Sequence, residues 1–428
     1  ILGIDSKRLL TFDHSDNING GSFSTLEMKD KTISFIYQAP IHSEKPIFNL
    51  NEIGILKNTS KKSTKKGFGN SGSCLINVNC SEGDDWQNQK RSVVRILTKV
   101  NGSIKQCSGS LLNNTAEDCS PYIITAEHCA NIANTDIYST SNDLESWQFY
   151  FNYESSTCEN PNDESVVNFQ TMTGATFIAQ SHDMGGDDGS DFFLVRLEED
   201  IPSDFNPYFL GWDKNNSAAT SGVSIHHPKY DIKKISTFNS DAVSDESING
   251  LPDTYWRVQW DETVNGHSIT EGGSSGSPLF NQNGLFIGTL NGGNSSCDNQ
   301  EGYDWYGKFS YSWESNGATS DRQLKPHLDP LNLGVSSLLG KDSYIQTTIS
   351  TKSEEICTGE SATFEISQQF SGETYNWFIN DTLTSSSSTF TSDTLETNDN
   401  IYLLSTNTEK CTNSNSVKSN MIIMTVED

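Results

Sequence analysis

The stretch TEGGSSGSPLF, residues 270–280, places three serines among glycines and ends in a proline and two apolar residues. Glycines tolerate the unusual backbone angles of a tight turn that points one oxygen outward and several N–H groups at one point. Such a turn suits a nucleophilic serine, because the N–H groups can stabilise an oxyanion. In the pattern Gly-X-Ser-Gly-X-Pro, the nucleophile is Ser275, and the N–H groups of Gly273 and Ser275 form the oxyanion hole. Ser274 is expected to supply mainly backbone to the turn.

A serine nucleophile needs a base that takes its proton and a carboxylate that orients the base. Among the eight histidines, His128 has the most suitable context, because YIITAEHCA (122–130) is an apolar strand that ends in a small-residue turn. A disulfide at Cys129 could anchor its backbone. Asp191 is the best acid, since GSDFFLVRL (189–197) places it at the mouth of an apolar strand that would shield it from water. The sequence therefore predicts a triad of His128, Asp191 and Ser275.

Other polar clusters are predicted to be structural. The histidines of SIHHPKY, His226 and His227, lack metal-binding spacing and read as the end of a strand. Three acids of a glycine-rich loop, Asp183, Asp187 and Asp188, are expected to be exposed, with a weak calcium loop as the minor alternative because EF-hand spacing is absent. We expect no cofactor and no metal.

The composition of the chain limits the classes of partner that the protein can bind. The 428 residues have room for two or three domains, and 28 Lys+Arg against 56 Asp+Glu give a net charge of −28. This field repels phosphate backbones and anionic headgroups, so neither nucleic acid nor a membrane surface is expected as a partner. No apolar run reaches the ~18 residues that a membrane helix requires, which predicts a soluble protein.

The nine cysteines match no CxxC or Cys/His zinc spacing, which favours disulfides and an oxidising, extracytoplasmic compartment. The count is odd, so one thiol is left over. The chain opens ILGIDSKRLL, without a Met or a signal-like segment, so we expect that an export peptide has been removed and that the protein is secreted.

The residue composition and the pattern of apolar runs change twice along the sequence and divide the chain into three parts. Residues 1–60 contain strand-like pieces such as KTISFIYQAPIH and lead into the lysine-rich tether KNTSKKSTKKGFGN. From Cys74 to about residue 340, short apolar runs alternate with turn residues, which is typical of a barrel or sandwich. After residue 345, Cys357, Trp377 and Cys411 have the spacing of an immunoglobulin-like sandwich, and this part resembles the Ig-like or PKD-like modules of secreted bacterial proteins.

The segments TAEHC, GSDFFLVRL and GGSSGSP, in the order His, Asp, Ser, resemble the chymotrypsin-like serine peptidases. Further segments resemble the bacterial lysyl endopeptidases in one register over roughly residues 71–330. They include SGSCLINVNC, CSGSLLNN, YFNYESSTC, IHHP, LNGGNSSC and DWYGKFSYSW. The resemblance implies an all-β, chymotrypsin-like double β-barrel and an endopeptidase that cuts after Lys, with Arg as an open alternative.

The resemblance also implies individual roles. The position six residues before Ser275, which holds the acid of trypsin-like pockets, is Ile269, and the acid moves to Asp304 in YDWYG. A buried carboxylate there would favour a basic substrate side chain. The substrate-binding strand contains Asn291 and Gly292. Asn291 stands where the family has a histidine, and the tryptophan that stacks on that histidine has no counterpart, so catalytic efficiency and pH range should change more than specificity.

The family's bridges imply disulfides Cys74–Cys297, Cys80–Cys158 and Cys107–Cys129. Cys357–Cys411 would then close the C-terminal module and leave Cys119 unpaired. A cut after Lys66 would release residues 1–66 as a propeptide removed by the enzyme itself, leaving a protease domain over 67–345 and an accessory domain over 346–428.

Two alternatives stay open at this point. One is a serine endopeptidase of broader specificity in which Asp304 does not reach the pocket. The other is a catalytically silent, secreted binding or adhesion protein that works through its Ig-like module. In the leading interpretation the protein is a monomer that acts on protein or peptide substrates.

Overall fold

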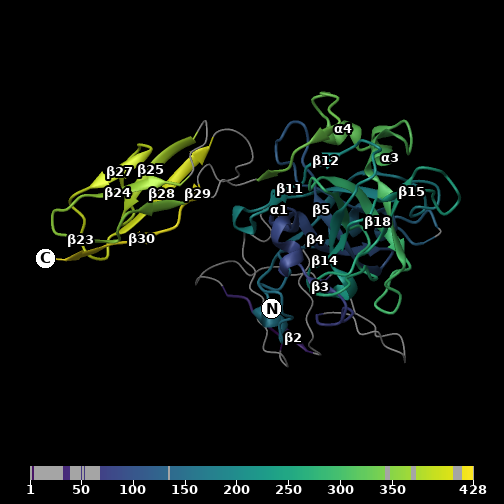
Figure 1. Cartoon of the computed structure of the whole chain (residues 1–428), viewed down its shortest axis with the longest axis horizontal. Helices are drawn as coiled ribbons and strands as arrows, with labels where there is room; N and C mark the ends of the chain where they lie inside the picture. Colours follow the sequence, from purple (N-terminus) through teal and green to yellow (C-terminus); the bar gives the residue numbers. More distant parts are fainter. Residues whose placement is uncertain are drawn as a thin grey trace.

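The computed structural model describes residues 2–3, 32–38, 50, 53, 68–133, 135–342, 348–367, 373–407 and 417–427. Regular structure in these residues is mostly β, which confirms the predicted class (Figure 1). Most of the predicted propeptide, including Lys66, lies outside the described residues. Of the strand expected at 31–42, the structure has β2 (Ile33–Ser34), which pairs with β1 (Leu2–Gly3).

A seven-stranded antiparallel sheet forms the first half of the predicted protease domain, in the order β8-β7-β4-β5-β6-β10-β9. Its strands are β4 (Val93–Val100), β5 (Ser103–Leu111), β6 (Tyr122–Ala126), β7 (Gln148–Phe151), β8 (Gln170–Thr173), β9 (Ala175–Gln180) and β10 (Phe192–Leu197). The apolar runs SVVRILTKV and FFLVRL form β4 and β10, as predicted. Their side chains fill a core around Trp147, Phe149 and Phe193.

A second, ten-stranded sheet forms the other half, with the main order β15-β16-β19-β18-β17-β13-β14-β3. Its strands are β3 (Ile76–Asn77), β12 (Trp212–Asp213), β13 (Gly222–His226), β14 (Lys234–Phe238), β15 (Val243–Asp245), β16 (Tyr255–Gln259), β17 (Pro278–Asn281), β18 (Phe286–Gly293), β19 (Tyr303–Lys308) and β20 (Ser337–Leu338). Trp256, Leu279 and Tyr306 lie in its own core.

The two halves share a third apolar core, which fixes how they meet. Ile124 and Phe192 from the first sheet pack there with Phe280 and Phe286 from the second. Strand β6 also contacts β18. As a result, the carboxyl end of β6 and the start of β10 face the turn before β17. This arrangement is the expected chymotrypsin-like pair of β-barrels, with the predicted triad residues at the junction.

Short helices and a small two-stranded ladder complete this predicted protease domain. They are α1 (Gln87–Ser92), α2 (Ser141–Leu144), α3 (Phe309–Glu314) and α4 (Lys325–Leu328), with β11 (Tyr208–Phe209) paired to β21 (Lys341–Asp342). No helix in the described ranges is both long and apolar enough to cross a bilayer.

The C-terminal module, yellow in Figure 1, is a separate β-sandwich. Its strands are β22 (Ile349–Thr351), β23 (Glu355–Cys357), β24 (Ala362–Ile366), β25 (Glu373–Ile379), β26 (Thr382–Ser385), β27 (Thr389–Ser392), β28 (Asn400–Asn407), β29 (Val417–Lys418), β30 (Ile422–Ile423) and β31 (Thr425–Glu427). Trp377 is fully buried between Phe364 and Phe390, as expected of the central tryptophan of an Ig-like core.

Candidate active site

His128 lies where β6 passes into a one-turn 3-10 helix, Glu127–Cys129. The disulfide Cys107–Cys129 ties this helix to β5, and the Lys105 ammonium donates to the His128 carbonyl at 3.1 Å. The backbone of His128 is therefore held from two sides. Its side chain keeps 27% of its surface exposed, so the imidazole can meet a substrate.

Asp191 is fully buried and stands one residue before β10, in a left-handed conformation with φ 52°. Strands β10 and β6 pair with Phe192 opposite Ala126, which brings Asp191 beside His128. Asp191 Oδ1 accepts the His128 N–H at 2.9 Å, and Oδ2 lies 2.7 Å from Nδ1. A carboxylate only accepts, so Nδ1 carries the proton and Nε2 is left as the basic nitrogen.

The turn of residues 271–278 is held by its own backbone and by β5. The Ser274 N–H donates to Glu271 at 2.9 Å, and the Ser108 N–H donates to the Ser275 carbonyl at 2.7 Å. A Cβ at Gly276 would collide with Thr125 Oγ1, so only glycine lets the turn approach the end of β6 this closely. Ser275 thus sits beside the segment that carries His128. Its hydroxyl has no hydrogen-bond partner among the described residues.

Two peptide groups of this turn have their carbonyls held by hydrogen bonds, which fixes the direction of their N–H groups. The Gly272 carbonyl accepts from the Lys229 N–H at 2.8 Å, and the Ser274 carbonyl accepts from the Ser277 N–H at 2.9 Å. In a trans peptide the N–H points opposite to the C=O, so the N–H groups of Gly273 and Ser275 face away from these partners. Within the described part of the chain, neither N–H donates a hydrogen bond. Gly273 has φ 101°, which glycine adopts without strain.

Asp304, on β19, is fully buried near the same turn. Its Oδ2 accepts from Trp260 Nε1 at 2.6 Å and from Thr270 Oγ1 at 2.7 Å, and Ser295 Oγ lies 2.8 Å from both oxygens. These donors are neutral, and no described Lys or Arg forms an ion pair with it. Burial raises the pKa of Asp304, while the hydrogen bonds oppose that rise. Asp304 is thus a buried carboxylate with no countercharge among the residues that the structure describes.

Residues 68–307 match the family described as "Lysyl endopeptidase, C-terminal domain". Residues 346–424 match the family described as "Ig-like domain CHU_C associated". The first match covers more than half of the chain. The chain belongs to the lysyl endopeptidase family. A relative named lysyl endopeptidase, from Pseudomonas aeruginosa, is 29% identical over 264 residues, 58% of this chain and 52% of the relative. The chain therefore spans about half the length of that relative.

Among solved structures, the protease Anisep from Arthrobacter nicotinovorans is similar with a TM-score of 0.35 and 16% identity, over 51% of this chain and 90% of that one. A Glu endopeptidase structure has a TM-score of 0.34 and 16% identity, over 56% and 92% of the two chains.

Three family disulfides are present as expected: Cys74–Cys297, Cys80–Cys158 and Cys107–Cys129. Two other cysteine predictions were wrong. Cys119, expected to be unpaired, is disulfide-bonded. Cys357, expected to close the C-terminal module, is free and exposed, while Cys411 lies outside the described residues. Sequence spacing alone contains no information on which cysteines approach one another.

Asn291, which the resemblance places at the position of the family's histidine, contacts Asp191 of the predicted triad directly. Its Nδ2 donates to Asp191 Oδ2 at 2.7 Å and to the Gly185 carbonyl at 3.0 Å. The neighbouring Gly292, also expected in substrate binding, borders open space, since a Cβ there would meet nothing within 4 Å. Asn291 therefore helps to hold the carboxylate of Asp191, the predicted catalytic acid, and the surface of β18 is open at Gly292.

We expect Asn291→Ala to lower kcat about 10- to 100-fold with a smaller change in KM, because it removes a hydrogen bond to a buried carboxylate. Steady-state kinetics on a lysyl peptide measure the effect. Asn291→His, which restores the family residue and a ring N–H donor, should recover part of the loss. An unchanged kcat in Asn291→Ala would contradict this role.

His226 and Ser274 have a joint role that sequence reasoning missed. His226 Nδ1 lies 2.7 Å from Ser274 Oγ, and Nε2 lies 3.1 Å from Ser236 Oγ. Burial lowers the pKa of His226 to about 3, with Lys234 adding to the effect, so the ring is neutral at physiological pH. The hydrogen bond to His226 thus anchors Ser274, and with it the turn that carries Ser275. The adjacent His-His pair was the available signal, but its partner lies 48 residues away.

The acidic loop also differs from expectation. Asp188 is exposed and Asp187 half-buried, but Asp183, predicted to be exposed, is only 5% exposed. Its carboxylate accepts the N–H groups of Gly186 and Asp191, at 2.8 and 2.9 Å. A glycine-rich acidic loop is usually solvated, and here it folds inward because the acid satisfies backbone donors of the loop itself.

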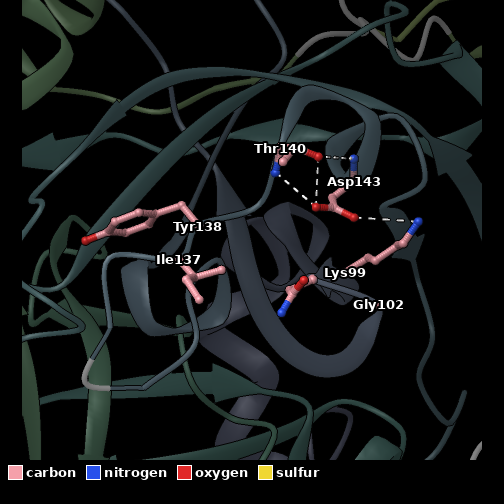
Figure 2. Close-up of a pocket in the computed structure, with 7 residues that line it drawn as sticks. Lys99, Gly102, Ile137, Tyr138, Thr140 and Asp143 are labelled. Atoms are coloured by element: carbon pink, nitrogen blue, oxygen red, sulfur yellow. Dashed lines mark hydrogen bonds and ion pairs between the residues drawn. The ribbon is translucent and has the colours of Figure 1, made fainter.

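A surface cavity of about 350 Å³ lies on the first barrel, and its lining includes none of the predicted triad residues. Figure 2 shows the Lys99–Asp143 ion pair on one side and Tyr138 on the other. The Tyr138 hydroxyl points away from this ion pair and donates to Glu127 Oε1 at 2.6 Å. Tyr138, on the wall of the cavity, therefore contacts Glu127, the residue before His128.

Proposed function

We propose that this chain is a secreted serine endopeptidase that hydrolyses peptide bonds after lysine. Ser275 Oγ attacks the scissile carbonyl, His128 Nε2 takes the proton and returns it to the leaving amine, and Asp191 holds the imidazole with Nδ1 protonated. The N–H groups of Gly273 and Ser275 bind the oxyanion. The strongest support is the hydrogen-bonded His128–Asp191 pair beside a turn whose Ser275 hydroxyl has no hydrogen-bond partner in the described part of the chain.

Asp304 selects the side chain that precedes the cleaved bond. It is a desolvated carboxylate whose three described donors are neutral, so a substrate ammonium would supply the missing positive charge. A Cβ at Gly293 would collide with Asp304 Oδ1, so this position of β18 must be glycine for the acid to lie beneath the substrate strand. Arginine has the same charge, and the test below compares the two.

The three disulfides support an extracellular location. The substrates are proteins or peptides, and the enzyme acts as a monomer without nucleic acid or membrane partners. A cut after Lys66 separates residues 1–66 from the protease domain at 67–345 and the accessory domain at 346–428. Because that bond follows a lysine, the enzyme can make the cut itself.

A panel of four fluorogenic peptides ending in Lys, Arg, Leu and Glu tests the function on the purified, processed enzyme. We expect kcat/KM for Lys to exceed that for Leu and Glu by about 10³-fold or more. Equal rates on all four peptides would favour the broader endopeptidase, and no turnover would favour the silent binding protein. Ser275→Ala provides the blank that excludes a contaminating protease.

A further inference from the structure

Two buried acids lie directly behind the His128–Asp191 pair. Glu127 precedes His128 in the chain and is fully buried, and Asp183 belongs to the glycine-rich loop before β10. The two carboxyl groups interact, and the Asp183 N–H also donates to both Glu127 oxygens at 3.1 and 3.0 Å. Neither acid takes part in the reaction as described above.

Asp183 controls the backbone that presents Asp191. One of its oxygens accepts the Asp191 N–H at 2.9 Å, and the other accepts the Gly186 N–H at 2.8 Å. Both of these residues have positive φ, 52° for Asp191 and 99° for Gly186. For Asp191 this conformation is unfavourable unless the surroundings impose it. The Asp183 carboxylate is the group that imposes it.

Glu127 in turn fixes Asp183. The hydroxyls of Tyr138 and Ser181 donate to its two oxygens, so the carboxyl group is held in one plane. A second link runs from Tyr255, whose hydroxyl donates to the Gly186 carbonyl at 3.2 Å. The path from Glu127 through Asp183 to Asp191 consists of buried hydrogen bonds, and such contacts are strong because water does not compete for them.

The described groups around the cluster carry too little positive charge to neutralise three ionised carboxylates, those of Glu127, Asp183 and Asp191. Besides His128 and Asp191, the groups that face Glu127 and Asp183 are Tyr138, which stacks on His182, and Tyr255, Tyr311 and Asp187. Two cations lie nearby. Lys105 donates to the carbonyls of His128 and Asn131, and Arg322 donates to the Ser181 and Asn316 carbonyls. Neither is ion-paired with Glu127 or Asp183 among the described residues.

A third negative charge in this dry region would be strongly unfavourable. Burial, reinforced by the charge of Asp183, raises the pKa of Glu127 to about 8. Burial, together with the charge of Asp191, also raises the pKa of Asp183. Two adjacent acids of this kind titrate as a pair and retain one proton at neutral pH.

We propose that Glu127 and Asp183 share one proton and act together as a positioning element for Asp191, and that loss of this proton limits the enzyme at alkaline pH. The proposal rests on the proposed function, because Asp191 must be the catalytic acid for its position to affect the rate. Below the titration of the pair, Asp183 holds the loop. Above it, three like charges repel one another and the loop that presents Asp191 is released.

The variant Glu127→Gln tests the pair, because glutamine keeps the shape and offers an N–H donor to Asp183 but cannot ionise. We expect kcat/KM of the wild type on a lysyl peptide to fall about tenfold for each pH unit above a midpoint near 8. The pH profile of kcat/KM for Glu127→Gln, scaled to its own maximum, should not show this alkaline limb, the decrease above pH 8. Glu145→Gln, an exposed acid of the same barrel, is the matched control and should retain the wild-type profile.

An identical alkaline limb in Glu127→Gln and wild type would overturn the proposal. Glu127→Ala should lower kcat more than KM rises, and recovery by Glu127→Gln would separate positioning from simple loss of packing. Difference infrared spectroscopy on the Ser275→Ala protein gives a readout that needs no activity. A protonated carboxyl band at pH 7 that vanishes above pH 8 and is absent with Glu127→Gln supports the pair even if the substrate class is wrong. Absence of such a band contradicts it.

Discussion

Replacing Ser275 with alanine is expected to lower kcat/KM on a lysyl peptide by about 10⁵- to 10⁶-fold, because no other group can form the acyl-enzyme. The residual rate comes from the oxyanion hole and from substrate binding. The same variant should accumulate a precursor that is uncut after Lys66. Progress curves with a fluorogenic peptide measure the first effect, and the mass and N-terminal sequence of the purified protein measure the second.

Ser274→Ala is the matched control, because it changes the neighbouring serine of the same turn. It leaves His226 Nδ1 without its partner, which should destabilise the fold by about 1–3 kcal/mol but retain most of the activity. Thermal unfolding and active-site titration separate the two effects. If Ser274→Ala were as inactive as Ser275→Ala, the choice between the serines would be wrong. Normal trimming in Ser275→Ala would assign the cut after Lys66 to another protease.

Asp304→Asn is expected to lower kcat/KM for a lysyl peptide by about 10²- to 10⁴-fold, or about 3–5 kcal/mol, while cleavage after an uncharged residue changes little. The substitution keeps the volume and removes the charge that meets the substrate ammonium. Stability should not fall, since the wild-type carboxylate is buried and forms no ion pair with any described Lys or Arg. The four-peptide panel and thermal unfolding measure both effects.

The pH dependence gives a second check on Asp304. Because burial raises its pKa, the free enzyme protonates Asp304 at a higher pH than an exposed aspartate does, so KM for the lysyl peptide should rise as the solution is acidified. This rise should disappear in Asp304→Asn. Asp298→Asn, an exposed acid beside Cys297, is the control and should behave as wild type. Undiminished Lys cleavage by Asp304→Asn would place the specificity pocket elsewhere.

Much of the fold could be predicted from local pattern. SVVRILTKV, FFLVRL and YWRVQW became β4, β10 and β16 because short apolar runs between turn residues have few alternatives to a buried strand. The Ig-like module followed from the spacing around Trp377. The disulfides were predicted less completely. The family resemblance implied three bridges correctly, but the states predicted for Cys119 and Cys357, which the resemblance did not cover, were wrong.

The candidate triad is a further case in which local context was informative. His128 and Asp191 each stand at the end of a strong apolar strand, so pairing of β6 with β10 was sufficient to bring them together. Their catalytic roles and that of Ser275 stay predictions, which the kinetics above test. The buried acids behind them, Glu127 and Asp183, could not be predicted from the sequence. Neither the TAEHC turn nor the glycine-rich loop indicates which carboxylate points into the protein interior.

The sequence by itself determined the strands, the glycine-rich turn that carries Ser275 and the separation of a protease-like part from an Ig-like part, since each depends on residues that are neighbours in the chain. Only the tertiary structure decided that Ser274 is held by His226, that Asn291 donates to Asp191, and that Asp183 and Glu127 lie buried behind His128 and Asp191. Those contacts join side chains from different strands and loops. Strand register and burial set them, and a shift of one residue would turn each side chain to the other face.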